Sequence, residues 1–288
     1  MKNPQPFPTF CRRDFIRAGL VASTALALTS RSAIAAVTKP QRPLYDGLKL
    51  GMASYTFRKF SLEQTLAMCK EAGATSISLK DFHLPYQSTK ATRQEARQKV
   101  EAAGLVLASG GVIYMKNNES EIRGFFDYAR DAGMPTIVAA PDLDALDTVE
   151  TMTREYNIRI AIHNHGPGDK RYPSPLDVLG LVKDRDEHMG ICIDVGHTVR
   201  LGLDPVAVIH QCAPRLYDFH IKDVTQAAPD GKPTEVGRGV IDIVGVLKTL
   251  VELHYAYNIG LEYEKKENDP MPGVLESFGY MRGVLDVV

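Results

Sequence analysis

Residues 159–166 read RIAIHNHG, an apolar run that ends in two histidines and a glycine. Apolar residues on both faces are typical of a buried parallel strand. Because side chains alternate along a strand, His163 and His165 are expected on the same side of the chain. Two imidazoles just beyond a buried strand indicate a metal or proton-transfer site, whereas two loop histidines bonded to backbone groups are the alternative.

The same pattern recurs along the chain. Eight short runs rich in Ile, Val and Leu alternate with amphipathic segments that are expected to be helices. The expected strands are 49–55, 75–80, 105–110, 136–140, 159–165, 189–196, 216–223 and 258–264. Eight βα units over residues 48–288 predict a (β/α)8 TIM barrel. A doubly wound open sheet is the alternative, but no glycine-rich dinucleotide fingerprint follows the first strand.

Local signals support the helical segments between these strands. Ser61 is expected to cap the first helix, and Pro175 and Pro205 suit the first turns of two later ones. Three of the helical segments, 61–73, 92–104 and 120–133, end in Ala-Gly. Glycine at that place terminates a helix in the left-handed conformation.

The first 35 residues have the features of an export signal. Arg12 and Arg13 precede a short apolar stretch and then a small-x-small cleavage pattern at 33–35. The paired arginines resemble a twin-arginine signal, which predicts a periplasmic protein. The expected organisation is a signal peptide (1–35), a linker (36–47) and a barrel domain (48–288). Because the apolar stretch is shorter than the roughly 20 residues that span a bilayer, no stable membrane anchor is expected; a retained anchor is the alternative.

Charge and cysteine content narrow the function classes. Five of the 34 Lys and Arg residues and one of the 35 Asp and Glu residues lie within 1–35, so the remainder carries a formal charge of −5. That balance opposes binding to nucleic acid or to an anionic membrane. The three cysteines beyond the signal, Cys69, Cys192 and Cys212, form no disulfide framework.

Polar residues gather where the active site of such a barrel lies, at the carboxyl ends of the strands. Five of the eight histidines fall there, namely His83, His163, His165, His197 and His220. The same edge carries Lys80, Asp194, Lys222 and Glu262. This clustering favours the metal interpretation of RIAIHNHG over the loop alternative.

A set of two imidazoles and two carboxylates suits one divalent ion such as Mn²⁺, Co²⁺, Zn²⁺ or Fe²⁺. Strands five to eight each offer one ligand: His163 or His165, then Asp194, His220 and Glu262. An ion held in this way can polarise a substrate carbonyl.

Two side chains at this edge, those of Glu262 and Lys222, are expected to have catalytic roles. Glu262 is expected to carry a proton besides binding the metal. Lys222 is expected to stabilise an oxyanion or act as an acid, and an ion pair with Asp223 or Asp81 is the alternative. Lys80, His83 and His165 are expected to contact substrate.

Three motifs at this edge resemble those of the xylose isomerase-like TIM barrel superfamily, which includes sugar phosphate isomerases and epimerases. They are CIDVGH (192–197), FHIKD (219–223) and LE (261–262), and the resemblance spans 48–288. It implies a metal bound by Asp194, His220 and Glu262, and a substrate contact for His197. The stretch 237–242 is similar to the family's G-x-G-x-I-D loop.

One departure from the family concerns His163, which stands where ketose epimerases carry a glutamate. This correspondence favours His163 over His165 as the ligand. Imidazole can still bind the metal and move protons near neutral pH, so His163 is also expected to be catalytic. A mechanism with one glutamate on each face of the substrate is not available.

The resemblance therefore implies a metal-dependent sugar isomerase or epimerase that transfers a proton next to a carbonyl through an enediolate. A lyase or hydratase acting on 3-keto-sugars or 3-keto-glycosides, and a barrel that binds sugar without catalysis, are the alternatives. Export and the lack of an evident phosphate cradle favour an unphosphorylated sugar. The family's abasic-DNA endonucleases are opposed by the charge of the barrel. Barrels of this kind often pair, so a homodimer is also an expectation.

Overall fold

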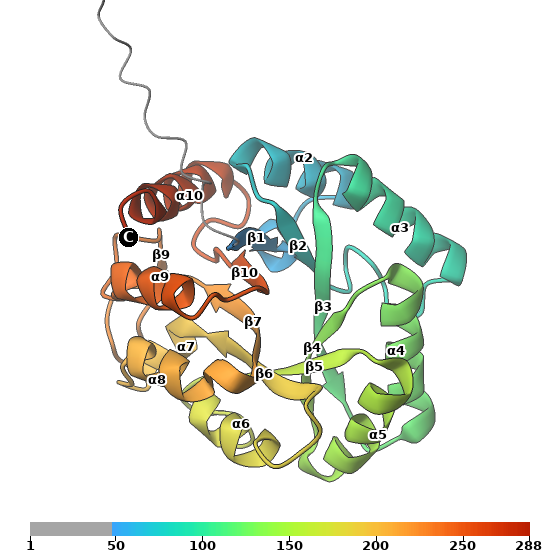
Figure 1. Cartoon of the computed structure of the whole chain (residues 1–288). Helices are drawn as coiled ribbons and strands as arrows, with labels where there is room; N and C mark the ends of the chain where they lie inside the picture. Colours follow the sequence, from blue (N-terminus) through green and yellow to red (C-terminus); the bar gives the residue numbers. More distant parts are fainter. Residues whose placement is uncertain (1–47) are drawn as a thin grey trace, which may run out of the picture. The chain divides into compact units, whose positions relative to one another are not determined.

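The structure is a computed structural model that describes residues 48–288. Eight parallel strands close into a barrel in the order β1-β10-β7-β6-β5-β4-β3-β2, and helices surround it (Figure 1). The prediction of a (β/α)8 TIM barrel is confirmed. The expected signal peptide (1–35) and linker (36–47) lie outside the described residues.

The elements follow the expected alternation of strand and helix. The barrel strands are β1 (Lys49–Ala53), β2 (Ser76–Leu79), β3 (Val106–Met115), β4 (Thr136–Pro141), β5 (Arg159–His163), β6 (Met189–Asp194), β7 (Leu216–Ile221) and β10 (Asn258–Leu261). The α-helices are α2 (Leu62–Ala72), α3 (Lys90–Ala102), α4 (Glu119–Ala132), α5 (Leu146–Tyr156), α6 (Pro175–Val182), α7 (Val195–Arg200), α8 (Pro205–Cys212), α9 (Ile243–Glu252) and α10 (Met271–Leu285). Three 3₁₀ turns are η1 (Ser54–Phe57), η2 (Leu143–Ala145) and η3 (Ala213–Arg215), and a short antiparallel pair is β8 (Asp223–Val224) with β9 (Pro233–Thr234).

Most of the expected helix ends are confirmed. Ser61 and Gln64 form a reciprocal capping box at the start of α2. Gly73 and Gly133 end α2 and α4 in the left-handed conformation. The third glycine, at 104, is also left-handed but lies one residue beyond the end cap of α3.

Strand β3 is longer than expected. The pair Gly110-Gly111 reads as a strand end, yet the strand continues to Met115 after an irregularity in its register with β4. Gly111 has φ +134°, and a Cβ there would lie 1.9 Å from the carbonyl oxygen of Val138. Glycine therefore permits the irregularity, and bulges of this kind re-aim the side chains that follow. As a result Tyr114 belongs to β3 and reaches the carboxyl edge of the barrel.

The main apolar core lies between the strands and the surrounding helices, and a smaller cluster of Val138, Ala161, Cys192 and Tyr217 forms a second apolar group. Cys69, Cys192 and Cys212 are buried free thiols. Within residues 48–288, no helix combines the length and apolar character needed to cross a bilayer.

Candidate metal centre

Four side chains from neighbouring strands converge at the carboxyl edge of the barrel. His163 and Asp194 are the last residues of β5 and β6, His220 lies one residue before the end of β7, and Glu262 follows β10. Each offers one ligand atom within 4.8 Å of those of the other three, and all four side chains are buried. Because these strands are parallel neighbours, their ends meet at one edge, as the positions in the sequence predict.

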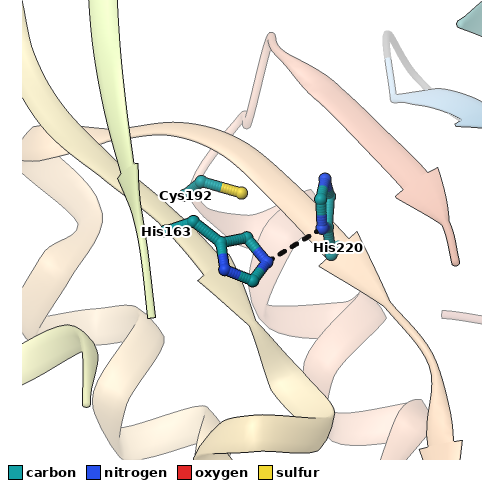
Figure 2. A group of neighbouring side chains, drawn as sticks. All are labelled: His163, Cys192 and His220. Atoms are coloured by element: carbon teal, nitrogen blue, oxygen red, sulfur yellow. Dashed lines mark hydrogen bonds between the residues drawn. The ribbon is translucent and has the colours of Figure 1, made fainter. Parts of the chain in front are cut away.

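The imidazoles of His163 and His220 face one another. The His163 Nε2 lies 3.1 Å from the His220 Nδ1 (Figure 2). Asp194 Oδ2 lies 3.5 Å from the His163 Nε2, and Glu262 Oε2 lies 3.5 Å from the His220 Nδ1. Two nitrogens and two carboxylate oxygens at these distances form a donor set that fits a divalent transition-metal ion.

Cys192 lies beside both imidazoles and forms a second potential ligand group with them (Figure 2). Its side chain is fully buried, and burial together with the nearby Asp218 and Asp194 raises the pKa of the thiol well above its usual value. A thiolate is the form that binds metals, and the raised pKa opposes formation of that thiolate. The set with Asp194 and Glu262 therefore fits a metal better than the set with Cys192.

Lys222 is buried among the carboxylates of this centre. Its Nζ lies 2.7 Å from Glu262 Oε2, 2.9 Å from Asp194 Oδ2 and 3.5 Å from Glu264 Oε2. Burial favours a lower pKa for Lys222, but the three carboxylates outweigh it and hold the pKa well above its usual value. The alternative pairing with Asp223 or Asp81 is wrong, since Asp223 instead accepts backbone N–H groups of the loop 237–241.

The candidate ligands differ in pKa. Burial opposes ionisation of Asp194 and Glu262, but Lys222 and the neighbouring imidazoles hold both pKa values well below the usual range. Burial, with a contribution from His220, lowers the pKa of His163 to about 3, whereas Glu262 and Asp218 outweigh burial and raise the pKa of His220. A neutral imidazole is the form that binds metals, so the lowered pKa of His163 fits its expected role as a ligand.

Next to this centre lies a cavity of about 590 Å³, and its walls contain most of the predicted substrate-contacting residues. Lys80, His165 and His197 line it together with His163 and Glu262. His165 follows β5 and stands outside the group of four converging residues. This geometry favours His163 over His165 as the candidate metal ligand.

His83 is the exception among these residues. Its Nε2 lies 3.0 Å from Thr65 Oγ1 and 3.1 Å from the carbonyl oxygen of Phe60, so the ring links the loop after β2 to α2. The ring packs edge-on against Phe82 and does not line the cavity. The expected substrate contact of His83 is therefore wrong: its position at a strand end gave the right edge of the barrel but not the direction of the side chain.

Three features of the site have no role in the sequence-based prediction, although Glu264, Tyr55 and Tyr114 are expected at this edge of the barrel. Asn164 donates to the Asp194 carbonyl oxygen at 3.3 Å and accepts from the Asp194 N–H at 2.7 Å, so it fixes the backbone of a ligand. Glu264 lines the cavity, and burial and the charge of Glu262 raise its pKa. Five aromatic side chains also line the cavity, namely Tyr55, Phe82, Tyr86, Tyr114 and Phe125. Alternation along 258–264 places Glu264 on the face of Glu262, but no comparable signal marks Asn164.

Comparisons with known proteins show which family the chain belongs to. The rhizopine catabolism protein MocC of Rhizobium meliloti is 25% identical over 269 residues, covering 76% of this chain and 79% of that protein. Inosose dehydratase of Clostridium beijerinckii is 24% identical over 152 residues, about half of each chain (48% and 49%). The structure of 3-keto-D-glucoside 4-epimerase from E. coli superposes with a TM-score of 0.68 at 15% identity, over 82% of this chain and 99% of that one. The family described as xylose isomerase-like TIM barrel matches residues 66–284, and this chain belongs to it.

Proposed function

We propose that this protein is a metal-dependent enzyme that transfers a proton next to the carbonyl of an unphosphorylated sugar, as an isomerase or epimerase does. The observation that carries the proposal is the convergence of His163, Asp194, His220 and Glu262 beside a cavity large enough for a monosaccharide. The membership of the chain in a family that contains such enzymes supports it.

In this proposal the four converging residues hold one divalent ion, either Mn²⁺, Co²⁺, Zn²⁺ or Fe²⁺. The bound ion would polarise the substrate carbonyl and so make the neighbouring C–H more acidic. Glu262 is ionised beside Lys222 and is the acceptor of that proton. A carboxylate with a lowered pKa is a weak base, so the reaction requires a C–H that is acidified by an adjacent carbonyl.

Lys222 lies behind the cavity wall and, beside Glu262, stabilises negative charge that develops there. The polar groups that line the cavity bind and orient the sugar. His165, His197 and Lys80 contact sugar hydroxyls. Among the described residues that line the cavity, Lys80 is the one lysine or arginine, against four carboxylates. This balance favours a neutral sugar over a sugar phosphate.

A lyase or dehydratase acting on a keto-sugar is the second candidate, and the state of His163 favours it. Epimerisation requires an acid or base on each face of the substrate, but His163 replaces the second carboxylate and is buried and neutral. Elimination requires one base next to the carbonyl and a donor to the leaving oxygen. The similarity to inosose dehydratase supports the same candidate.

Solvent-deuterium exchange tests both candidates. The Mn²⁺-loaded protein is incubated in D₂O with fructose, methyl 3-keto-glucoside and 2-keto-inositol, and loss of the proton next to the carbonyl is followed by NMR. We expect exchange with at least one sugar and a fall of about 10²–10⁴-fold in Glu262→Gln. An unsaturated product identifies the lyase, and a new sugar identifies the isomerase. A protein that binds one of these sugars without exchange would be a binding barrel instead.

We also propose export to the periplasm by the twin-arginine route, on the basis of residues 1–35. The test fuses these residues to a reporter that functions only after export in the folded state. Replacement of Arg12 and Arg13 by lysine is expected to retain the reporter in the cytoplasm. Export that persists in the lysine variant would contradict the proposal.

A further inference from the structure

A chain of three polar side chains runs along one wall of the cavity. The Tyr114 hydroxyl lies 3.2 Å from His165 Nε2, and the two rings stack with an interplanar angle of 23°. On the other side of the imidazole, the His165 Nδ1 lies 3.4 Å from Asp169 Oδ2. Tyr114 comes from the extended part of β3, His165 follows β5, and Asp169 lies in the loop before α6. Tyr114 and His165 line the cavity.

The loop after β5 holds Asp169 and His165 in this arrangement. Asp169 Oδ1 accepts hydrogen bonds from the backbone N–H groups of Arg171 at 2.7 Å and Tyr172 at 2.8 Å. The backbone N–H of His165 in turn donates to the carbonyl oxygen of Tyr172 at 2.9 Å. Because Oδ1 is occupied by two donors, Oδ2 is the oxygen that faces the imidazole.

This arrangement sets the direction of the hydrogen bond between Tyr114 and His165. The His165 Nδ1 has no hydrogen-bond partner among the described residues, but the negative charge of Asp169 Oδ2 at 3.4 Å favours the tautomer of His165 that carries its proton on Nδ1. The Nε2 of that tautomer is an acceptor, and the Tyr114 O–H therefore donates to it. The phenolic oxygen is left with lone pairs toward the cavity, so it can accept a hydrogen bond but not donate one.

We propose that Tyr114, oriented by His165 and Asp169, is a specificity-determining residue that accepts a hydrogen bond from one hydroxyl group of the sugar. A hydroxyl donates to this oxygen, whereas a methoxy or a keto oxygen at the same position meets a second acceptor. The inference rests on the proposal that the cavity binds a sugar. It adds that the wall at Tyr114 selects a hydrogen-bond donor on that sugar.

A comparison of matched sugars tests the inference. Affinities of the metal-loaded protein for methyl 3-keto-glucoside and for its 2-, 4- and 6-deoxy analogues are measured by titration calorimetry. We expect Tyr114→Phe to weaken binding of the parent sugar about 3- to 10-fold, the effect of one neutral hydrogen bond. For one deoxy analogue the same substitution is expected to have no effect. That analogue lacks the sugar hydroxyl that donates to Tyr114, so no hydrogen bond remains to be lost.

A matched control removes a phenolic hydroxyl elsewhere. The Tyr156 hydroxyl donates to Asp127 at 2.9 Å between α5 and α4, away from the residues that line the cavity. Tyr156→Phe is expected to leave all four affinities unchanged. An equal loss for the parent and every analogue in Tyr114→Phe, or no loss at all, would overturn the inference.

Asp169→Asn provides the test of the two positioning residues. The two backbone donors keep the amide oxygen of Asn at the Oδ1 place, so its NH₂ group faces His165. That contact favours the other tautomer, in which Nε2–H donates to Tyr114 and the phenolic O–H turns toward the cavity. Both a hydroxyl and a methoxy oxygen accept from that O–H, so we expect the variant to discriminate less against the O-methyl analogue at the selected position than the wild-type protein does, which a loss of structure alone would not produce. An unchanged ratio of the two affinities would overturn the role of Asp169.

The same experiments distinguish failure of the Tyr114 inference from failure of the proposed function. Wild-type protein that binds and exchanges a keto-sugar but fails the deoxy comparison contradicts only the role of Tyr114. Wild-type protein that neither binds nor exchanges any of these sugars contradicts the proposed function, and the inference fails with it.

Discussion

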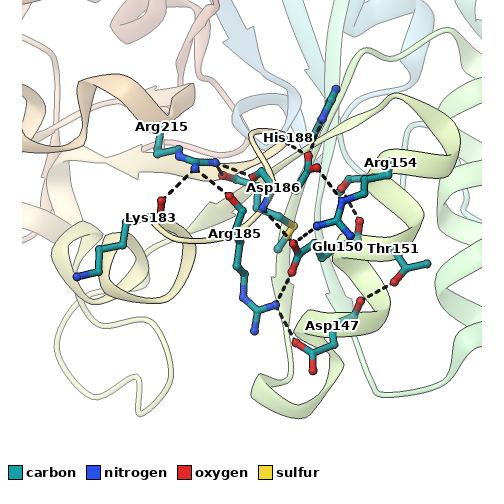
Figure 3. A network of polar contacts seen from close by, with 11 residues as sticks. Asp147, Glu150, Thr151, Arg154, Lys183, Arg185, Asp186, His188 and Arg215 are labelled. Atoms are coloured by element: carbon teal, nitrogen blue, oxygen red, sulfur yellow. Dashed lines mark hydrogen bonds and ion pairs between the residues drawn. The ribbon is translucent and has the colours of Figure 1, made fainter.

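At the amino-terminal ends of β6 and β7, the charged groups are paired within the protein, whereas at the carboxyl ends ion pairs stand beside buried polar atoms that have no partner among the described residues. Arg215 donates to the backbone oxygens of Lys183, Arg185, Asp186 and Met189 (Figure 3). Arg185 reaches Asp147 at 2.8 Å and Glu150 at 2.6 Å. Each arginine at this end therefore has its oxygen partners in neighbouring segments of the chain.

At the carboxyl ends, the buried polar atoms outnumber their partners. Within the described residues, His163 Nδ1 and His220 Nε2 have no hydrogen-bond partner, and one ammonium, that of Lys222, lies among three carboxylates. Buried polar or charged groups that lack partners cost stability unless a bound ligand supplies those partners. The difference teaches that one end of the barrel is built for stability and the other for binding.

The largest expected effect is the loss of the metal. His220→Ala removes a ligand, and we expect the affinity for Mn²⁺ to fall by more than about 100-fold, since even loss of an outer-shell partner costs 10- to 100-fold. Elemental analysis of the purified protein measures it. His188→Ala is the control, because that ring bonds Asp186 and Asn157 at the opposite end. Equal metal content in both variants would remove the distinction between the ends.

The next effect concerns Lys222, the ammonium closest to the carboxylates of the candidate metal centre. Lys222→Met leaves Asp194 without its lysine and leaves Glu262 with only the more distant Lys80 at 3.8 Å, so the metal-free protein is expected to lose about 3–5 kcal/mol of stability. Addition of Mn²⁺ should restore a large part, because the ion neutralises the same carboxylates. Urea unfolding with and without the ion measures both changes. Unchanged stability of the metal-free variant would contradict the role of Lys222 as the counter-charge.

A smaller effect is expected at the amino-terminal end. Arg215→Met removes the donor of four backbone oxygens, and we expect a loss of about 2 kcal/mol of stability. Metal content and deuterium exchange should stay at the wild-type level, because the residue is remote from the cavity lining. Urea unfolding and elemental analysis test the two statements. A loss of metal in this variant would show that the two ends are coupled.

The smallest effect is a dependence on pH. The backbone N–H of His188, together with Arg154, lowers the pKa of Asp186 below its usual value, against the effect of burial. A carboxyl with a lowered pKa stabilises the folded state above its unfolded pKa near 4, and this contribution is lost as the pH falls below about 4. Asp186→Asn should therefore cost about 0.5–1 kcal/mol at pH 7 and flatten the acid limb of the stability curve. Parallel acid limbs in both proteins would contradict this assignment.

The sequence by itself determined the barrel and the edge at which its chemistry lies. Short runs that are apolar on both faces, separated by capped amphipathic segments, allow few arrangements other than eight βα units. Parallel strands all end at one edge, so His163, Asp194, His220 and Glu262 had to approach one another there. These conclusions depend only on local pattern and strand direction, which the sequence contains.

Only the tertiary structure decided which way the side chains at that edge point. His83 turns toward Thr65, Lys222 lies between Asp194 and Glu262, and Tyr114 reaches His165. Each of these contacts joins residues more than 15 positions apart, and their directions follow from how loops and helices pack. The bulge in β3 likewise depends on the close approach of Gly111 to β4, a constraint that becomes visible only when the strands are side by side.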